Sequence, residues 1–307
     1  MPTAATDPHI VFIVCHQTKY LDIVLAGLSR QTRRPERVIV SCDVDERAIG
    51  EVIEQWAPTV GAPVSWVRRA HHGIARCSQV RNNAARHAIF DLGIRRGRLI
   101  QLDGDILATP TLVEEHARLG EKAELVYANR VDLDRAASES LDAHRVALPE
   151  TPSLTEAMIA ELERRHRRAQ RHLVLRRMGL APKHKPKLLG ANWSASIDIW
   201  LRLNGFDEHY QGWGYLDDEF ARRAARAGAS CAIGIRDAVA FHLWHEKRQP
   251  PGPMTANPNY QRFARRDLPV RAEHGLEHPI PQNPVSATVF EGKGQRLRAA
   301  PAPVGAG

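Results

Sequence analysis

The chain lacks the features that mark secreted, disulfide-rich and membrane-spanning proteins. Its 307 residues include only four cysteines with no CxxC pair, which favours reduced thiols over a disulfide framework. No apolar run approaches the roughly 20 residues that cross a bilayer. The opening MPTAATDPHI has no basic segment followed by an apolar one, so we expect no signal peptide. These absences predict a cytoplasmic protein.

Aromatic residues are also few. They make up 6% of the chain and do not alternate with basic residues, so we expect no stacking platform for nucleic acid. The net charge is nevertheless +8, which indicates either an anionic partner, such as a nucleotide or a phospholipid surface, or a basic surface that faces solvent. The hydrophobic share of 43% is that of an ordinary globular protein with one large core.

The first 130 residues alternate between expected strands and expected helices. Runs of β-branched and other apolar residues predict strands at Ile10–Cys15, Val38–Cys42, Val64–Val67, Leu99–Leu102 and Glu124–Ala128. Helices are expected at Tyr20–Leu28, Arg47–Trp56 and Gln79–Leu92. Such alternation predicts an α/β fold with a Rossmann-like, mostly parallel sheet flanked by helices. Ligands of such sheets bind beyond the carboxyl ends of the strands.

A basic insert follows, over about residues 131–187. Leu154–Met178 is expected to be helical and is rich in Arg and His. Two interpretations stay open: peripheral contact with an anionic membrane at its inner face, or a solvated helix hairpin with an apolar stripe against the domain. From Gln249 onward Pro and Gly accumulate, so residues 249–307 are expected to form a partly disordered extension.

Carboxylates and histidines gather in three short segments. Asp103-Gly104-Asp105 ends the strand Leu99–Leu102, where two carboxylates can hold a hard divalent cation or simply close a turn. Gly212-Trp213-Gly214 precedes Asp217-Asp218-Glu219, which either serve chemistry or cap the expected helix Asp217–Ala227. His242 and His245 follow the apolar run Ala238–Phe241, and a strand-end histidine is either a ligand for a cation such as Mn²⁺ or a hydrogen-bonded side chain.

These segments occur in the same order as the sequence motifs of a known protein family. The stretches VFIVCHQTKYLDIVLAGLSRQTRRPERVIVSCD, GIARCSQVRNNAA and RLIQLDGD resemble the nucleotide-binding start, the Arg-Asn segment and the DxD motif of glycosyltransferase family 2. LLGANWSASIDIWLRLNGFDEHYQGWGYLDDEFARRAARAG and AVAFHLWH resemble the galactosyltransferase C-terminal segment of chondroitin-polymerase-type enzymes. The resemblance covers roughly residues 9–130 and 187–247 and implies a GT-A fold.

The resemblance also implies a division of the chain. It predicts a GT-A domain over residues 1–248, with a nucleotide-binding part at about 9–130. The basic insert follows at about 131–187, and an acceptor and metal part occupies about 188–248.

Site residues follow from the same resemblance. The donor would be bound by His16, Gln17, Asp43, Arg81, Asn82, Asp103 and Trp213, with Asp43 on the base and Trp213 stacked on the sugar. The divalent cation, Mn²⁺ or Mg²⁺, would be held by Asp103, Asp105 and His242, with His245 as a second candidate.

Catalysis and acceptor binding are assigned in the same way. Asp217 matches the general base, and the helix dipole is expected to keep it ionised. Asp218, Trp193 and Tyr215 are second-line candidates near the acceptor. The family's Gly-Trp-Gly-Gly-Glu-Asp reads Gly-Trp-Gly-Tyr-Leu-Asp here, so Leu216 replaces a carboxylate that binds the acceptor sugar in relatives.

The resemblance implies a metal-dependent glycosyltransferase of the hexosyltransferase type. It would move a sugar from a nucleotide diphosphate donor, expected to be a UDP-sugar, to an acceptor hydroxyl with inversion, in polysaccharide or glycoconjugate synthesis. Two alternatives stay open: a catalytically inactive GT-A homologue that binds carbohydrate, and a nucleotidyltransferase. The latter needs a Gly-rich basic loop after the first strand, which CHQTKYL lacks.

Overall fold

The computed structural model describes residues 7–71, 73–147, 152–246, 254–291 and 296–297. Its strands are β1 (His9–Cys15), β2 (Arg37–Cys42), β3 (Val64–Arg68), β4 (Arg98–Asp103), β5 (Ile106–Ala108), β6 (Leu125–Tyr127), β7 (Val131–Asp132), β8 (Asn192–Ser196), β9 (Cys231–Ile233), β10 (Ala240–His242), β11 (Ser286–Phe290) and β12 (Arg296–Leu297). They form one large sheet in the order β12-β11-β3-β2-β1-β4-β8-β6-β9 and a smaller sheet in the order β5-β10-β7.

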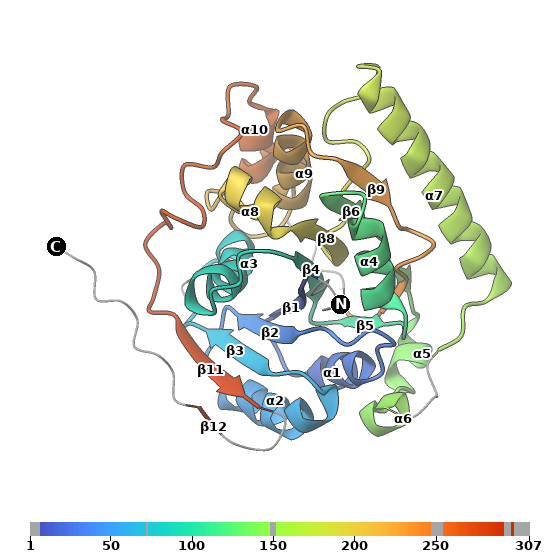
Figure 1. Ribbon diagram of the computed structural model, residues 1–307, viewed down its shortest axis with the longest axis vertical. Helices are drawn as coiled ribbons and strands as arrows, with labels where there is room; N and C mark the ends of the chain where they lie inside the picture. The colour runs from blue at the N-terminus through green and yellow to red at the C-terminus, as the bar shows by residue number, and fades with distance from the viewer. Residues whose placement is uncertain (1–6, 72, 148–151, 247–253, 292–295, 298–307) are drawn as a thin grey trace, which may run out of the picture.

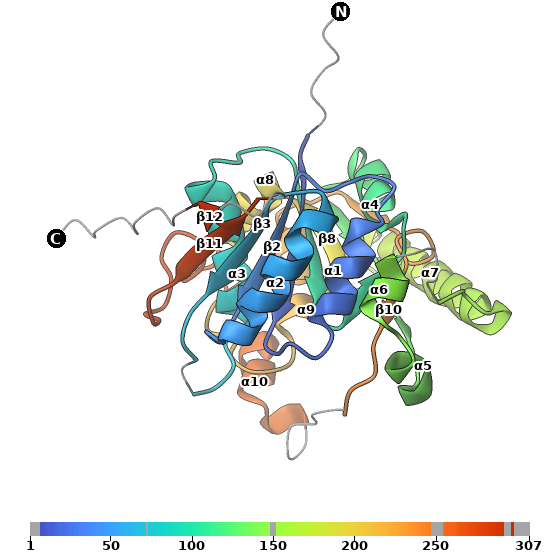
Figure 2. The same cartoon turned by 90° about the horizontal axis from the view of Figure 1, so that it is seen from below.

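Helices cover both faces of the large sheet (Figure 1). They are α1 (Leu21–Ser29), α2 (Arg47–Val60), α3 (Cys77–Arg86) with the π-helical turn η1 (His87–Asp91), α4 (Leu112–Gly120), α5 (Arg135–Glu139), α6 (Ala143–Ala147), α7 (Glu156–Arg177), α8 (Ile197–Leu203), α9 (Leu216–Arg226), the 3-10 turn η2 (Met254–Ala256) and α10 (Pro258–Ala264). In Figure 2, α1 and α2 lie side by side in front of the central strands. The predicted α/β fold flanked by helices is therefore confirmed.

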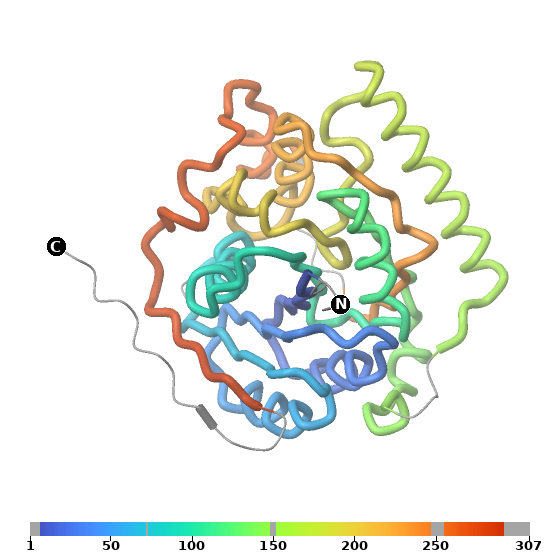
Figure 3. Tube along the Cα trace, viewed as in Figure 1, coloured from blue at the N-terminus to red at the C-terminus, as the bar shows by residue number. Residues whose placement is uncertain are grey.

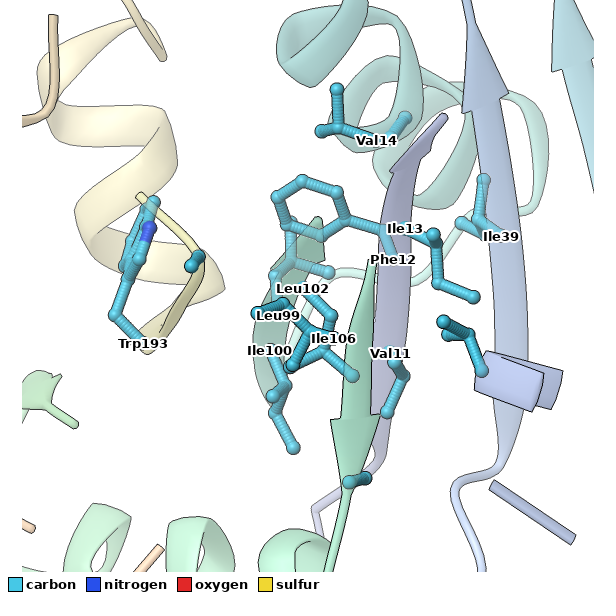
Figure 4. Close-up of a cluster of buried hydrophobic side chains, with 14 of the residues drawn as sticks. Val11, Phe12, Ile13, Val14, Ile39, Leu99, Ile100, Leu102, Ile106 and Trp193 are labelled. Atoms are coloured by element: carbon cyan, nitrogen blue, oxygen red, sulfur yellow. The ribbon is translucent and has the colours of Figure 1, made fainter. Parts of the chain in front are cut away.

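The centre of the sheet is parallel, and antiparallel pairs flank it on both sides. β1 runs parallel to both β2 and β4, and β2 runs parallel to β3. All seven residues of β1 are buried, which accounts for its continuous apolar sequence. Figure 4 shows its side chains packed with those of the neighbouring strands. β8 then enters antiparallel to both β4 and β6, so the sheet is mixed outside its centre.

A polar residue is enclosed between α4 and β8. His116 is fully buried, and its ring nitrogens lie 2.9 Å from Ser194 Oγ and 2.9 Å from Asn192 Oδ1. Burial lowers the pKa of His116 to about 3, because the charged imidazolium would lose its hydration. The ring is therefore neutral in the folded protein near pH 7.

The basic insert contains one long helix. α7 begins where Thr155 Oγ1 accepts a hydrogen bond from the Met158 amide. Leu162, His166, Ala169 and Leu173 form its buried face, which packs along the edge strand β9. Most of its arginines face solvent on the opposite side, and Figure 3 shows the helix at the margin of the molecule. No helix in the described part of the chain is long and apolar enough to cross a bilayer.

Residues 254–291 run along the outside of the domain that was predicted to end at residue 248. β11 pairs antiparallel with β3 and extends the large sheet. Before it, backbone carbonyls accept hydrogen bonds from α3: Leu276 O from Arg86 Nε at 2.9 Å, and Ile280 O from Gln79 Nε2 at 2.8 Å. This segment therefore belongs to the same packed unit as α3, although its sequence predicts an extension.

Candidate active site

A cavity of about 470 Å³ opens at the carboxyl ends of β1 and β4, where ligands of parallel sheets bind. Several residues predicted from the sequence line this cavity: His16, Gln17, Arg81, Asp103, Asp105, Trp213, Tyr215, Asp217 and Asp218. They come from the loop after β1, from α3, from the turn after β4 and from the start of α9. The fold thus brings together residues more than 200 positions apart.

Asp105 meets two histidines at the edge of this cavity. Its Oδ2 lies 3.5 Å from His242 Nε2 and 3.2 Å from His245 Nε2. One ligand atom from each of the three residues fits within 4.8 Å of the others, a spacing that suits a single cation. Asp105 Oδ1 is buried and has no hydrogen-bond partner among the described residues. The structure therefore brings Asp105 together with both histidines.

The smaller sheet positions this cluster. β10 pairs antiparallel with β5, which follows Asp105, and parallel with β7 on its other side. The register sets His242 opposite Asp132, whose Oδ1 lies 3.0 Å from His242 Nδ1. Asp132 also lies 3.3 Å from Arg130 Nε. Neither residue is predicted from the sequence, because β7 is only two residues long and carries no recognisable pattern.

The environment of Asp105 keeps it charged. Burial favours the neutral acid, but the hydrogen bond and positive charge of His242 and the charge of His245 lower its pKa below the usual range. A carboxylate beside two imidazoles is a donor set that suits Mn²⁺ or a similar divalent cation. Asp105, His242 and His245 therefore fit a cation.

Asp103 takes part in a different arrangement. Its Oδ1 lies 3.6 Å from Arg81 Nη2, and the same nitrogen lies 3.9 Å from Asp217 Oδ1. Arg81 Nε donates to Gln101 Oε1 at 2.9 Å, which fixes the guanidinium between the two carboxylates. Burial raises the pKa of Asp103 to about 7, although Arg81 opposes the rise. Asp103 and Asp217 thus share one buried arginine.

Asp217 lies in the first turn of α9, as predicted, but its environment differs from the expectation. Burial raises its pKa above the usual range, and the charge of Arg81 only partly offsets this. Burial thus acts against the helix dipole, and the expected ionisation of Asp217 stays a prediction. Burial also raises the pKa of Asp218, to about 6, against the charge of Lys187. Both groups are stronger bases than ordinary surface aspartates.

A glycine missed by the sequence analysis lies between these groups. A Cβ at Gly190 would be 2.6 Å from Asp217 Oδ2 and 3.0 Å from Arg81 Nη2. The Gly190 carbonyl also accepts a hydrogen bond from Gln101 Nε2. The close approach of Arg81 to Asp217 therefore requires a residue without a side chain at position 190.

Trp213 lies at the rim of the cavity. Its side chain is exposed (63%), and Gly212 and Gly214 on either side adopt φ values of +66° and +103°, which favour glycine. Asn257 Nδ2 donates to the Trp213 carbonyl at 3.1 Å, and Asn259 Nδ2 donates to the Gly214 carbonyl at 3.0 Å. The start of α10 thus holds the loop that presents the indole to solvent.

Two of the predicted site residues do not line the cavity. Trp193, expected near the acceptor, is fully buried and stacks on Trp200 with ring centroids 5.9 Å apart. Asn82, expected at the donor, is also fully buried, and its amide nitrogen donates to the Phe206 carbonyl and to Glu208 Oε1, both at 2.9 Å. Each side chain holds elements together and presents no atom to the cavity.

Asp43 is enclosed rather than open to the cavity. It is ion-paired with buried Arg69, and its Oδ2 accepts a hydrogen bond from the Arg76 amide at 2.9 Å. His71, whose side chain is 47% exposed, covers it at 3.6 Å. The expected contact of Asp43 with a nucleoside base stays a prediction.

Comparisons with known proteins agree with this architecture. Residues 172–239 match the family described as the N-terminal domain of galactosyltransferase. TarS from S. aureus superposes with a TM-score of 0.50 at 12% identity, over 77% of this chain and 37% of that one. GalNAc-T7, solved with UDP, GalNAc and Mn²⁺, superposes with a TM-score of 0.55 at 13% identity, over 83% of this chain and 47% of that one.

The chain has the GT-A glycosyltransferase fold. The stretch that matches the galactosyltransferase family model runs from the last two turns of α7 to the residue before β10, and so includes Trp213 and Asp217. This GT-A chain spans less than half the length of either solved chain. No curated protein matches its sequence.

Proposed function

We propose that this GT-A protein is a metal-dependent glycosyltransferase that moves a sugar from a UDP-sugar to an acceptor hydroxyl. The observation that carries the proposal is the shared cavity: a partly buried carboxylate, Asp217, lies beside the Asp103–Arg81 pair and the Asp105 cluster. A binding protein needs no such concentration of partly buried carboxylates, because taking charges out of water destabilises the fold.

Asp105, His242 and His245 would hold the cation, with Asp103 facing the same space. When bound, a divalent cation neutralises charge that develops on a departing diphosphate. Arg81, which lines the same cavity, would bind the diphosphate as a second positive charge. Trp213 offers its exposed face to the sugar, and His16 and Gln17 line the end of the cavity where β1 ends. GalNAc-T7, with its bound UDP and Mn²⁺, supports this donor and this cation.

Asp217 is the proposed general base. Its raised pKa makes it a better proton acceptor than a surface aspartate, and Arg81 steadies the carboxylate before it accepts the acceptor's hydroxyl proton. Attack from the side opposite the leaving diphosphate would invert the anomeric centre. Leu216 is buried at the position where relatives carry an acceptor-binding carboxylate, so acceptor recognition differs here.

The wider setting is part of the proposal. Free thiols at all four cysteines suit a reducing cytoplasm, and polysaccharide or glycoconjugate synthesis is the proposed pathway class. The proposed GT-A unit includes residues 1–248, with the basic insert inside it. Residues 254–291 join this unit through β11 and α10.

The test is UDP release from a panel of UDP-sugars, with and without Mn²⁺. We expect metal-dependent release that is lost in Asp105→Ala and in His242→Ala. UDP binding without any turnover across donors and acceptors would support the inactive carbohydrate-binding homologue instead. Pyrophosphate release from nucleoside triphosphates would support a nucleotidyltransferase.

A further inference from the structure

A second cavity, of about 320 Å³, lies between the end of α7 and the turn from α9 to β9. Three basic side chains line it: Arg176, Arg177 and Lys183. The opposite wall is formed by small residues of the turn, among them Gly228, Ala229 and Ser230. None of the lining residues is acidic. The cavity therefore concentrates positive charge on one side and leaves room on the other.

Arg176 has no carboxylate partner in the described part of the chain. Its guanidinium nitrogens lie 3.2 Å from Tyr127 Oη, 3.2 Å from Cys231 Sγ and 3.4 Å from the Lys183 carbonyl, all of which are uncharged at neutral pH. A half-buried guanidinium held by neutral acceptors keeps its full positive charge available to an anion.

The surrounding surface is uncompensated in the same way. Residues 156–187 contain ten Arg and Lys against three Glu, a net charge of +7 out of +8 for the whole chain. Within the described residues, only Arg164 and Arg165 of these ten have a carboxylate within salt-bridge distance, and both share Glu161. Elsewhere on the surface, most arginines that form a salt bridge have a carboxylate to themselves, as Arg47 has Glu51. The unpaired positive charge of this segment is thus available to bind an external anion.

Exposed apolar side chains lie at the same, C-terminal end of α7. Val174, Met178 and Leu180 are 53%, 65% and 68% exposed, and they lie within three residues of Arg177, the last residue of the helix. Exposed aliphatic side chains among cations are typical of protein surfaces that enter the boundary between lipid headgroups and acyl chains. A soluble anion would leave these side chains in water.

We propose that the end of α7 docks on an anionic phospholipid surface. The phosphate of a headgroup lies in the cavity lined by Arg176, Arg177 and Lys183, while Met178 and Leu180 enter the boundary with the acyl chains. From this tip the chain returns to Lys187, which lines the proposed active site. Docking therefore fixes the transferase cavity at a set distance from the lipid surface.

Vesicle co-sedimentation tests the proposal with the full chain. Phosphatidylcholine vesicles are compared with vesicles that also contain phosphatidylglycerol, at low and at high salt. We expect retention only on the anionic vesicles and a decline with salt. Arg177→Glu with Lys183→Glu should weaken retention about tenfold or more, since each cation near such a surface contributes a severalfold effect. Met178→Ser with Leu180→Ser should also weaken it, without changing the charge.

Matched controls separate docking from general charge and from misfolding. Arg95→Glu with Arg96→Glu makes the same change in net charge at exposed positions outside the segment, and Phe90→Ser removes an exposed apolar side chain there. Both should keep vesicle binding, and all variants should keep UDP affinity. Equal retention on neutral vesicles, or equal losses in the control and tip variants, would overturn the proposal. So would displacement from the vesicles by inorganic phosphate together with unchanged retention of the Met178 and Leu180 variant, because the cavity would then bind soluble phosphate.

Discussion

Replacing Asp132 by alanine should weaken metal binding without touching a proposed metal ligand. Asp132 Oδ1 lies 3.0 Å from His242 Nδ1, which fixes the ring so that Nε2 faces Asp105. Carboxylates that orient a ligating histidine typically contribute 10–100-fold to metal affinity. The Asp132 side chain is 62% exposed, so solvent screens the pair and the low end applies. We expect about tenfold weaker binding, or about 1.4 kcal/mol.

Isothermal titration of the UDP-loaded protein with Mn²⁺ measures this loss directly. Asp132→Asn should recover most of the affinity, because its side-chain oxygen can still accept the hydrogen bond from Nδ1. The chain offers a matched control in Asp91, whose Oδ2 lies 3.0 Å from His87 Nδ1 with the carboxylate 58% exposed. Asp91→Ala removes the same kind of pair away from the cavity and should leave Mn²⁺ affinity unchanged.

Two results would refute the reasoning. Unchanged Mn²⁺ affinity in Asp132→Ala would mean that His242 needs no orientation or is not a ligand. Equal losses in Asp132→Ala and Asp91→Ala would mean that any lost ion pair lowers affinity through general destabilisation. Electron paramagnetic resonance of bound Mn²⁺ adds a second readout, because a freed imidazole changes the symmetry of the ion's surroundings.

Three further predictions concern the base, the aromatic core and the response to acid. Asp217→Asn should lower kcat about 10²–10⁴-fold and leave the affinities for UDP and Mn²⁺ unchanged. Asp218→Asn should lower kcat much less. Loss of donor binding in Asp217→Asn would show that Asp217 is a donor ligand and not the general base. Trp193→Ala should lower the free energy of unfolding by about 3–5 kcal/mol. The milder Trp193→Phe should leave the KM for the acceptor unchanged, and a raised KM would indicate that Trp193 contacts the acceptor. His116 has a folded pKa of about 3 against the ordinary histidine value of 6.5, so the unfolded chain binds more protons and acid favours unfolding. Lowering the pH from about 7.5 to about 5 should therefore reduce the free energy of unfolding by about 2 kcal/mol, as measured by urea titration. The His116→Gln variant should lose that much less stability over the same pH range.

Patterns that depend on neighbouring residues were readable from the sequence. β1, β2, β3 and β4 are buried on both faces, so each appears as a short apolar run, and the predicted ranges agree with the structure to within a few residues. α7 was recognisable because its buried residues repeat at helical spacing. The three segments that line the cavity each follow such an element, so their place at the strand ends could be inferred.

Features that depend on tertiary contact were not readable. β8 is the polar-looking Asn192–Ser196, and burial of Trp193 comes from Trp200, Phe206 and Phe220 packing around it. Nothing in the sequence distinguishes a tryptophan in such a cluster from one that faces a sugar. The position of β11 likewise depends on the free edge of β3. A segment rich in Pro and Gly carries no pattern from which this pairing could be predicted.

The late segment that wraps α3 has a consequence for how the protein is made. Ile280 and Leu276 hydrogen-bond to residues synthesised 201 and 190 positions earlier. At ribosomal speeds of about 5–20 residues per second, α3 waits roughly 10–40 s for these partners. During that time the helix that bears Arg81 lacks its outer support, and β3 presents an unpaired edge to other nascent chains. Folding of this unit is thus completed only after β11 has been synthesised, and a pause in translation before residue 290 prolongs the exposure of β3 to aggregation and to chaperones.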